Sequence, residues 1–304
     1  MILVSLLVFI PIWIGMANAA GDTAFRRAEE VYNSGNYLIA AQQFRSFIER
    51  FPESSLVVKA KFYVASCQKK SGESDEALMT YVSIIESGAD KEDILAAIEE
   101  VGNLRSIQAR EYLEKKLSHS DIQMRGAVAL ALGKVGNKKT VQKMMEVLKG
   151  EKESLIQKDL LDAISSIGPQ LAKLSSLKEL FRKGSEDLKI NIVKLMSNIR
   201  KNEVVTFLSD ELKKSSETVS PYIVWALARI DPYRYGVRIE GIIEREKNSY
   251  FIVSKNALRF ELVSPSEKTD RLKEFVNKPV ILFGGEYNGK VLYTHIYDVA
   301  KEAR

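Results

Sequence analysis

The residues best suited to chemistry are few and far apart in this sequence. Its two histidines are His119, in the polar stretch KLSHSD, and His295, in the alternating stretch THIYDV. A zinc site or a histidine-assisted nucleophile needs partners at short, regular spacing, and the sequence contains no HExxH or CxxC pattern. Paired carboxylates such as Glu99-Glu100 read as part of a solvated helix face. The sequence therefore predicts a protein that is not an enzyme and that uses no cofactor and no metal.

The single cysteine, Cys67, lies in the apolar helical stretch KFYVASCQKK. One cysteine cannot form an internal disulfide, so the core alone must hold the fold together. A reactive thiol needs basic, partly exposed surroundings with a histidine nearby. Lys69 and Lys70 are close in sequence, but no histidine is. We therefore expect Cys67 to be a small buried hydrophobe.

Two glycines 37 residues apart, Gly35 and Gly72, mark the first internal repeat. The same interval separates Ala40 from Ala77, Phe44 from Tyr81, and Phe47 from Ile84. A glycine allows the chain to reverse, and a small alanine one turn into the next helix lets two helices approach. The aromatic residue four positions later lies on the same helix face and fills the seam. Residues 22–90 are therefore predicted to form two helix-pair repeats.

These positions resemble the tetratricopeptide family. Its small-residue and aromatic signature positions match Ala28, Gly35, Tyr37, Ala40, Phe44 and Pro52, and in the second unit Ala65, Gly72, Ala77 and Tyr81. The spacing and the junction FPESS look like the longer-period repeats of periplasmic cell-envelope proteins. Two positions depart from the pattern, because Ser74 replaces the aromatic residue after the second glycine and no proline closes the second unit.

The resemblance also implies a binding groove, since the first helix of each tetratricopeptide unit lines a concave surface. Carried onto this sequence, the candidate partner-binding residues are Phe25, Glu29, Tyr32, Asn33, Lys59, Phe62, Ser66 and Lys69. Aromatic rings beside several polar groups suit an extended or helical peptide. With only two units the groove is short, and the edge helix could instead mediate self-association.

Residues 91–231 carry a second repeat, with closing positions 102, 136, 168, 200 and 231. Four residues before the Val or Ile of each closing stretch stand Ala97, Ala131, Ala163, Leu195 and Ala226, which helical periodicity places on an apolar face. The clearest unit resembles the HEAT-like repeats through Asp121 and Arg125. We count about four and a half units. Asp121 is expected to cap its helix, and Arg125 either ties neighbouring repeats together or lines the concave face.

Helical periodicity stops at Asp231-Pro232, and residues 235–304 read as a small all-β domain. Three alternating segments are followed by a short helix at 270–276 and by a hairpin that turns at Asn288-Gly289. This order is that of a five-stranded OB-like barrel. Gly284-Gly285 reads as a bulge or turn in the first hairpin strand.

Barrels of this kind often bind oligonucleotides or sugars through exposed aromatic rings, which gives the alternative function of a glycan- or nucleic-acid-binding barrel. The candidate rings are Tyr250, Tyr287, Tyr293 and Tyr297. These rings could instead pack the barrel or its contact with the last helix pair. Barrel packing around Tyr222 and Trp225 would cover the open end of the repeats.

The first twenty residues contain no charged side chain, and an apolar run at 2–16 leads to Ala17-Asn18-Ala19. This pattern predicts a signal peptide at residues 1–19 and a periplasmic protein. No Lys or Arg precedes the run, so the alternative is an uncleaved segment that anchors the protein to the inner membrane. The net charge of +5 comes from basic residues mixed with acidic ones, which reads as an ordinary solvated surface.

Together these patterns predict a mainly α protein: an α-α solenoid of tetratricopeptide-like and then HEAT-like repeats, with a small C-terminal all-β (OB-like) domain. Stacked repeats expose an extended surface. We therefore expect a non-catalytic cell-envelope scaffold or adaptor that binds a protein or peptide. Self-association is a second possibility, and membrane contact is expected only if the N-terminal segment is retained.

Overall fold

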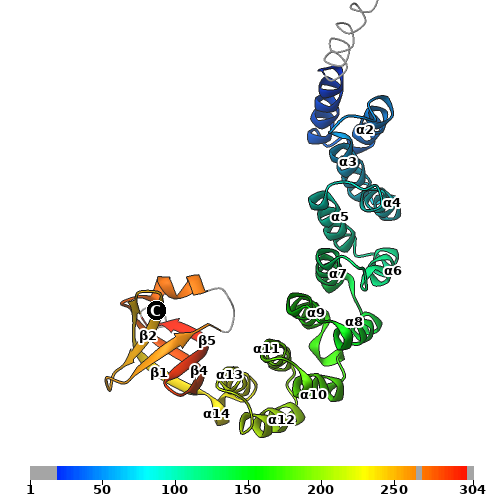
Figure 1. The fold of residues 1–304 in the computed structure, drawn as a ribbon. Helices are drawn as coiled ribbons and strands as arrows, with labels where there is room; N and C mark the ends of the chain where they lie inside the picture. The colour runs from blue at the N-terminus through cyan, green and yellow to red at the C-terminus, as the bar shows by residue number, and fades with distance from the viewer. Residues whose placement is uncertain (1–18, 265–268, 300–304) are drawn as a thin grey trace, which may run out of the picture. The chain divides into compact units, whose positions relative to one another are not determined.

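Short turns join a succession of helices in the first part of the computed structural model, which describes residues 19–264 and 269–299 (Figure 1). The helices are residues 19–33, α2 (Tyr37–Arg50), α3 (Val57–Lys70), α4 (Ser74–Ile85), α5 (Lys91–Asn103), α6 (Ile107–Lys116) and α7 (Ile122–Val135). From α2 onward, each helix packs against the next, α5 also packs against α7, and α4 also touches α6. The helices therefore form the two layers of a helical-repeat stack.

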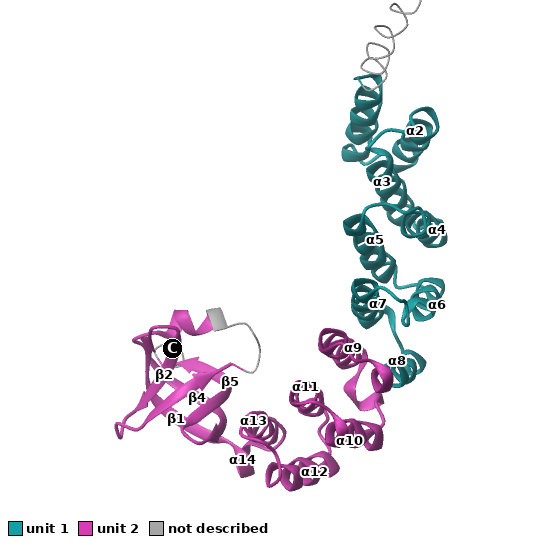
Figure 2. Cartoon of the chain, in the orientation of Figure 1, with its two compact units in different colours: residues 1–147 teal, residues 148–304 magenta. Residues whose placement is uncertain are grey.

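The chain divides into two compact units, residues 1–147 and residues 148–304 (Figure 2). The division falls inside α8 (Lys138–Gly150), within the segment predicted as one run of HEAT-like repeats. Apart from Ala19, the predicted signal peptide lies outside the described residues. In the described ranges, no helix is both long enough and apolar enough to cross a membrane.

The two glycines of the first repeat lie in the turns that precede α2 and α4. Gly35 and Gly72 have φ angles of +85° and +83°, in the left-handed region that favours glycine. The small and aromatic residues that follow them are part of the core, as predicted, and Ala40, Phe44, Ala77 and Tyr81 are each at most 2% exposed. The turn glycines and the core residues thus repeat at the same interval because each turn starts an equivalent helix.

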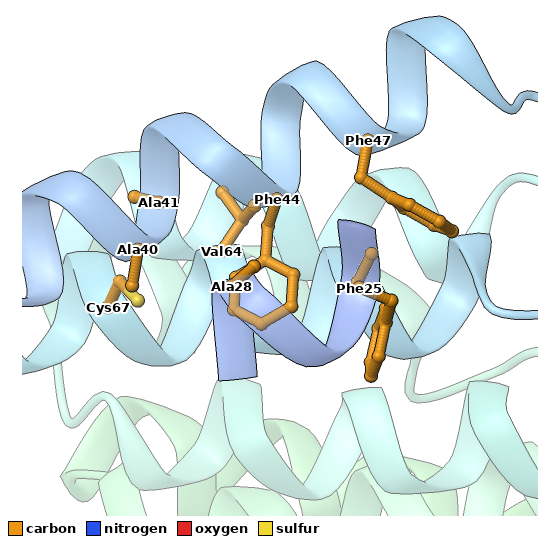
Figure 3. Close-up of a cluster of buried hydrophobic side chains, with 9 residues drawn as sticks. Phe25, Ala28, Ala40, Ala41, Phe44, Phe47, Val64 and Cys67 are labelled. Carbon is orange, nitrogen blue, oxygen red and sulfur yellow. The ribbon is translucent and has the colours of Figure 1, made fainter. Parts of the chain in front are cut away.

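Aromatic rings dominate the core of the first helix pairs (Figure 3). The cluster takes Phe25 from helix 19–33, Phe44 and Phe47 from α2, and Cys67 from α3. The Phe25 ring meets Phe44 and Phe47 edge-on, with ring centroids 5.3 and 5.5 Å apart. Each fully buried aromatic side chain contributes about 2–3 kcal/mol to folding. Cys67 is buried, and burial raises the pKa of its thiol, which confirms the prediction of a small buried hydrophobe.

The second repeat is visible in where its helices end. Helices α5, α7, α9 (Ser154–Ile167) and α13 (Ser220–Ile230) each end within one residue of a predicted closing position. Helix α11 (Glu186–Met196) ends earlier than position 200, because residues 197–199 turn back onto its last carbonyls. The apolar residues predicted before the closing positions are all buried, namely Ala97, Ala131, Ala163, Leu195 and Ala226.

The Asp-Arg pair of the clearest HEAT-like unit holds the turn before α7. Asp121 Oδ1 accepts the Met124 backbone N–H at 3.0 Å, which confirms the predicted cap. Its other oxygen, Oδ2, accepts Lys91 Nζ of α5 at 2.8 Å. Arg125 Nη1 donates to the carbonyl oxygens of His119 and Ser120, at 2.9 and 3.0 Å. Arg125 therefore braces the turn of its own unit, and Asp121, through Lys91, makes the tie to the neighbouring repeat.

In the second unit, further helices continue the repeat pattern. They are α9, the 3-10 turn Pro169–Leu171, α10 (Leu174–Lys183), α11, α12 (Asn202–Leu212), α13 and α14 (Pro232–Tyr235). The predicted stop at Asp231-Pro232 ends α13, but one more helical turn, α14, follows. Asp231 caps this turn by accepting the Arg234 N–H, and Pro232 suits its first position.

A closed five-stranded barrel follows, as predicted. Its strands are β1 (Val237–Glu246), β2 (Ser249–Ser254), β3 (Arg259–Val263), β4 (Pro279–Tyr287) and β5 (Lys290–Asp298), in the spatial order β1-β2-β3-β5-β4. Strands β3 and β5 pair in parallel, and all other pairs are antiparallel. The short helix predicted between β3 and β4 is instead a 3-10 helix, η2 (Thr269–Phe275). Asn288 and Gly289 turn the hairpin with positive φ angles.

The barrel packs on α13 through β4 and β5. A Cβ atom at Gly285 would lie 2.7 Å from the Val224 backbone and 2.8 Å from the Trp225 nitrogen, so only glycine allows this approach. The neighbouring Gly284 marks a register shift in the β4-β5 ladder, as expected of a bulge. The barrel thus packs on α13 at Trp225, which is buried, as the sequence suggested. Among the described residues, however, no hydrogen bond or ring contact joins Tyr222 to the barrel.

Candidate functional site

One layer of the first unit, formed by helix 19–33, α3 and α5, carries an open pocket. Its volume is about 560 Å³. It is lined by Tyr32, Lys59, Phe62, Tyr63, Ser66, Lys69, Lys70, Tyr81, Asp93 and Glu100, and we call it the tyrosine–lysine groove. The α3 residues recur at intervals of three and four, which places them on one stripe of that helix. Helical periodicity in α3 therefore builds the floor of the groove.

A carboxylate on helix 19–33 holds two groove residues of α3. Tyr63 Oη donates to Glu29 Oε1 at 2.6 Å, and Lys59 Nζ lies 3.3 Å from the same oxygen. The Tyr63 hydrogen bond, more than Lys59, lowers the pKa of Glu29. Burial, and then the Glu29 carboxylate, raise the pKa of Tyr63 to about 12. At neutral pH, the ionised Glu29 carboxylate therefore accepts a hydrogen bond from the protonated Tyr63 hydroxyl.

Equivalent contacts join α3 to α5 at the other side of the groove. Lys69 Nζ lies 3.0 Å from Glu100 Oε2, and Asn103 Nδ2 donates to the other oxygen of Glu100 at 3.2 Å. Burial and the nearby Glu100 carboxylate raise the pKa of Tyr81. The groove walls are thus braced by hydrogen bonds and ion pairs between successive repeats, which keeps its aromatic rings in place.

Most of the predicted partner-binding residues meet in this groove. Those that line it are Tyr32, Lys59, Phe62, Ser66 and Lys69. Tyr32 Oη and Ser66 Oγ are 2.8 Å apart. Glu29 does not line the groove, but it accepts the Tyr63 hydroxyl and pairs with Lys59. Asn33 is exposed at the end of its helix and is not among the lining residues.

The prediction that Phe25 binds a partner is wrong, because this side chain does not face the groove. Its side chain is only 3% exposed and packs against Phe44 and Phe47 (Figure 3). Its ring also meets that of Tyr63, with centroids 5.8 Å apart. The ammonium of Lys59 lies 5.0 Å from the centre of its ring. Phe25 and Tyr32 are seven residues apart and lie on nearly the same helix face, since a seven-residue step falls only about 20° short of two full turns. They differ in what covers them: the rings of Phe44, Phe47 and Tyr63 surround Phe25, whereas Tyr32 lines the groove.

The sequence prediction missed the wall that α5 supplies. Asp93 and Glu100 lie beyond residue 90, where the tetratricopeptide-like segment was predicted to stop, so α5 was not considered as part of the groove. A signal was nevertheless present, because Glu100 follows Lys69 by 31 residues, close to the repeat length. Residues one repeat apart on equivalent helices lie side by side in a stack.

The four barrel tyrosines do not share one exposed face. Tyr250 is buried in the barrel core and Tyr293 packs against it, because both occupy inward positions of their strands. Tyr287 is half-buried, and Tyr297 is 39% exposed. The Tyr297 ring lies parallel to that of His295, with centroids 6.2 Å apart. Of the two possibilities that the sequence left open, Tyr250 and Tyr293 follow the second and pack the barrel.

The two histidines lie in unlike surroundings. His119 Nδ1 accepts the Asp121 N–H at 3.1 Å within the turn before α7. His295 is exposed on β5, and its Nδ1 lies 3.2 Å from Thr294 Oγ1. Across the part of the chain that the structure describes, no three His, Cys, Asp or Glu residues gather where they could hold a metal ion.

Comparison with known proteins identifies the repeats but not a close relative. The family model for HEAT repeats matches residues 79–165, from within α4 to within α9. No curated protein matches the chain. Among solved structures, the chain resembles the complex of CpcE and CpcF of phycocyanin lyase from Nostoc sp. PCC7120, at 16% identity and a TM-score of 0.38, over 59% of this chain and 73% of that one.

It also resembles human deoxyhypusine hydroxylase, at 14% identity and a TM-score of 0.26, over 72% of this chain and 88% of that one. Both similar structures are enzyme-related, so the prediction that this chain is not an enzyme is not supported and is withdrawn. The chain is a mainly helical solenoid with HEAT repeats and a C-terminal five-stranded barrel.

Proposed function

We propose that the tyrosine–lysine groove binds a peptide segment of a partner protein, and that the chain acts as a scaffold or adaptor. The observation that carries the proposal is the convergence of aromatic rings, ammonium groups and carboxylates from three successive helices of one layer on a single open pocket. A volume of about 560 Å³ lies within the range of about 300–1,000 Å³ that ligand pockets occupy.

The chemistry of the lining suits a peptide in two ways. The rings of Tyr32, Phe62 and Tyr63 offer apolar surface for side chains. Ammonium groups lie on α3, at the floor, and carboxylates on α5, at one wall, so groups of both signs of charge line the groove. Since a lysine ammonium has three N–H donors, Lys69 retains donors after pairing with Glu100. A peptide could therefore bind without breaking the ion pairs that brace the groove.

A photo-crosslinking experiment in the native cells tests this proposal. A photoreactive amino acid would replace Lys70 in the groove or, as the control, Met79, which is 74% exposed on α4 and does not line the groove. We expect a defined partner to be captured from position 70 and not from position 79. We expect the double variant Lys59→Glu, Lys69→Glu to weaken capture at least about tenfold, because it reverses two charges at the groove. Equal capture from both positions, or capture that survives the double variant, would contradict the groove.

We also propose that the protein is exported and works in the periplasm, as a partner-binding component of the cell envelope. The support is the apolar run at 2–16 before Ala17-Asn18-Ala19 and the resemblance of residues 22–90 to periplasmic repeat proteins. Fractionation of cells and mass measurement of the N-terminal peptide test this. A periplasmic chain that begins at Ala20 is expected. A full-length chain in the inner membrane would show that the segment is an anchor, and a full-length chain in the cytosol would refute export.

A further inference from the structure

The two ends of the barrel are closed to different degrees. At one end, η2 acts as a plug, because Leu272 is buried in the barrel core and Phe275 and Val276 pack against it. The Asn277 N–H donates to the Ile243 carbonyl at 2.8 Å and holds this plug on β1. The opposite end is formed by the start of β1, the β2-β3 turn and the end of β4. There a pocket of about 500 Å³ opens.

Apolar side chains form the floor and one edge of this barrel-end pocket. Val237 and Phe260 are partly buried against the barrel core, and Leu258 lies at the edge with 58% of its surface exposed. The turn that carries Leu258 is well braced, since Ser254 Oγ accepts the Leu258 N–H at 3.1 Å. Ala257 in that turn has φ +61°, which is unfavourable for any residue with a Cβ atom. A strained, braced turn thus holds an exposed leucine at the pocket.

Two cations and two carboxylates line the rim, and both cations lie beside Glu240. Glu240 is paired with both Arg238 and Lys255, at 2.5 Å each. The only other acidic lining residue, Glu286, accepts the Gly289 N–H at 2.8 Å and so is turned toward the hairpin. Arg238 and Lys255 carry five and three N–H donors, so each retains donors after pairing with Glu240. The carboxylate of a bound ligand would therefore pair with Arg238 and Lys255 beside an apolar floor.

We infer that the open end of the barrel binds a ligand with an apolar chain that ends in one carboxylate. The chain would lie on Val237, Phe260 and Leu258, and the carboxylate would meet Arg238 and Lys255. Both a free aliphatic acid and the C-terminal residue of a peptide that ends in leucine present this chemistry. The inference is independent of the proposed groove, which lies in the other unit.

Calorimetric titration of the full chain tests the inference, with octanoate, octylamine and octanol as probes. We expect octanoate to bind with one-to-one stoichiometry and the other two at least about tenfold more weakly, because only the acid pairs with the rim cations. Lys255→Glu should weaken octanoate binding about fivefold or more, since it removes one exposed ion pair and adds repulsion. The control is Lys290→Glu, which makes the same charge reversal elsewhere on the barrel and should change the affinity less than about twofold.

Leu258→Ser separates pocket binding from surfactant-like adsorption. Because Leu258 is exposed, this substitution leaves the core intact, and it should weaken octanoate binding by about threefold to tenfold through lost apolar contact. Binding that is insensitive to both Lys255→Glu and Leu258→Ser overturns the site, as does equal binding of octanoate and octylamine. In a second arm, acetyl-Gly-Ser-Leu is compared as acid and amide. Acid-selective binding of this peptide identifies a peptide C-terminus as the source, and its failure beside octanoate binding identifies a free acid.

Discussion

In the helical repeats, side chains bridge neighbouring helices at intervals of about one repeat, whereas the barrel closes by pairing its first strand with its fourth. The hydrogen bond from Tyr112 to Glu86 spans 26 residues and the one from Lys134 to Glu99 spans 35, about one repeat each. The barrel closes only when β1 pairs with β4, as in Val237 with Gly284, and when β3 pairs with β5. Repeats are thus stabilised by each neighbour in turn, while a barrel forms as a whole.

The same difference separates the two pockets. The tyrosine–lysine groove is assembled from equivalent positions on successive helices, so every wall is braced by the next repeat. The barrel-end pocket is what remains when a closed sheet is plugged at only one end. A groove of the first kind can lengthen by adding repeats, and a pocket of the second kind has a size set by the number of strands.

The largest expected effect tests whether a core substitution in the first repeats destabilises only the helices around it. Phe44→Ala removes a ring that stacks on Tyr63 at 4.6 Å and meets Phe25, and it should destabilise these helices by about 3–5 kcal/mol. Hydrogen exchange read by mass spectrometry should show faster exchange in helix 19–33, α2 and α3, with barrel peptides unchanged. Leu38→Ala, on the exposed side of α2, is the control and should change stability by less than about 0.5 kcal/mol. Faster exchange in the barrel peptides would contradict a local response of the repeats.

A smaller effect is expected where a repeat helix meets the barrel. Gly285→Ala places a Cβ atom 2.7 Å from the backbone of α13 and should cost about 1–3 kcal/mol by overpacking. Denaturant unfolding followed by the fluorescence of Trp225 should shift to lower denaturant. Gly150→Ala, at the end of α8 where a Cβ atom meets nothing within 4 Å, should leave the midpoint unchanged or raise it slightly, because Ala favours a helix more than Gly does. If both variants behave alike, the close contact between β4 and α13 is not a determinant of stability.

The smallest expected effect concerns the Glu29 carboxylate that braces the groove. Because its pKa is lowered in the folded protein, its contribution is present above the pKa of the unfolded chain and is lost as the pH falls through the folded value. Glu29→Gln should therefore cost less than about 1 kcal/mol at pH 7 and still less near pH 3. Urea unfolding at the two pH values measures this, with Glu53→Gln as an exposed control. A cost that is the same at both pH values would show that charge is not what Glu29 supplies.

Local patterns were enough to predict most elements of this fold. Helical periodicity located the buried alanines of the second repeat, and the alternating segments and the Asn288-Gly289 turn located the strands and the hairpin. The cap at Asp121 followed from residue type alone. Such features depend on neighbours within a few residues, so they can be inferred without the rest of the chain.

The candidate sites depended on more distant contacts. The prediction included Tyr32, Lys59 and Phe62, but it could not assign Asp93 and Glu100 to the same groove until α5 was stacked on α3. It grouped Tyr293 with Tyr297 because residues four apart on a regular strand share a face. The register shift opposite Gly284 skips Thr294, so Tyr293 packs on the barrel core while Tyr297 is exposed.

The sequence by itself determined the class of fold, the order of its elements and the residues that fill its helical core. Only the tertiary structure decided which ends of the barrel are closed, which tyrosines point inward and which helices share the groove. The physical reason is that periodicity records the local conformation and the polarity of a face, whereas a pocket is formed by side chains from elements whose spatial arrangement no single segment encodes.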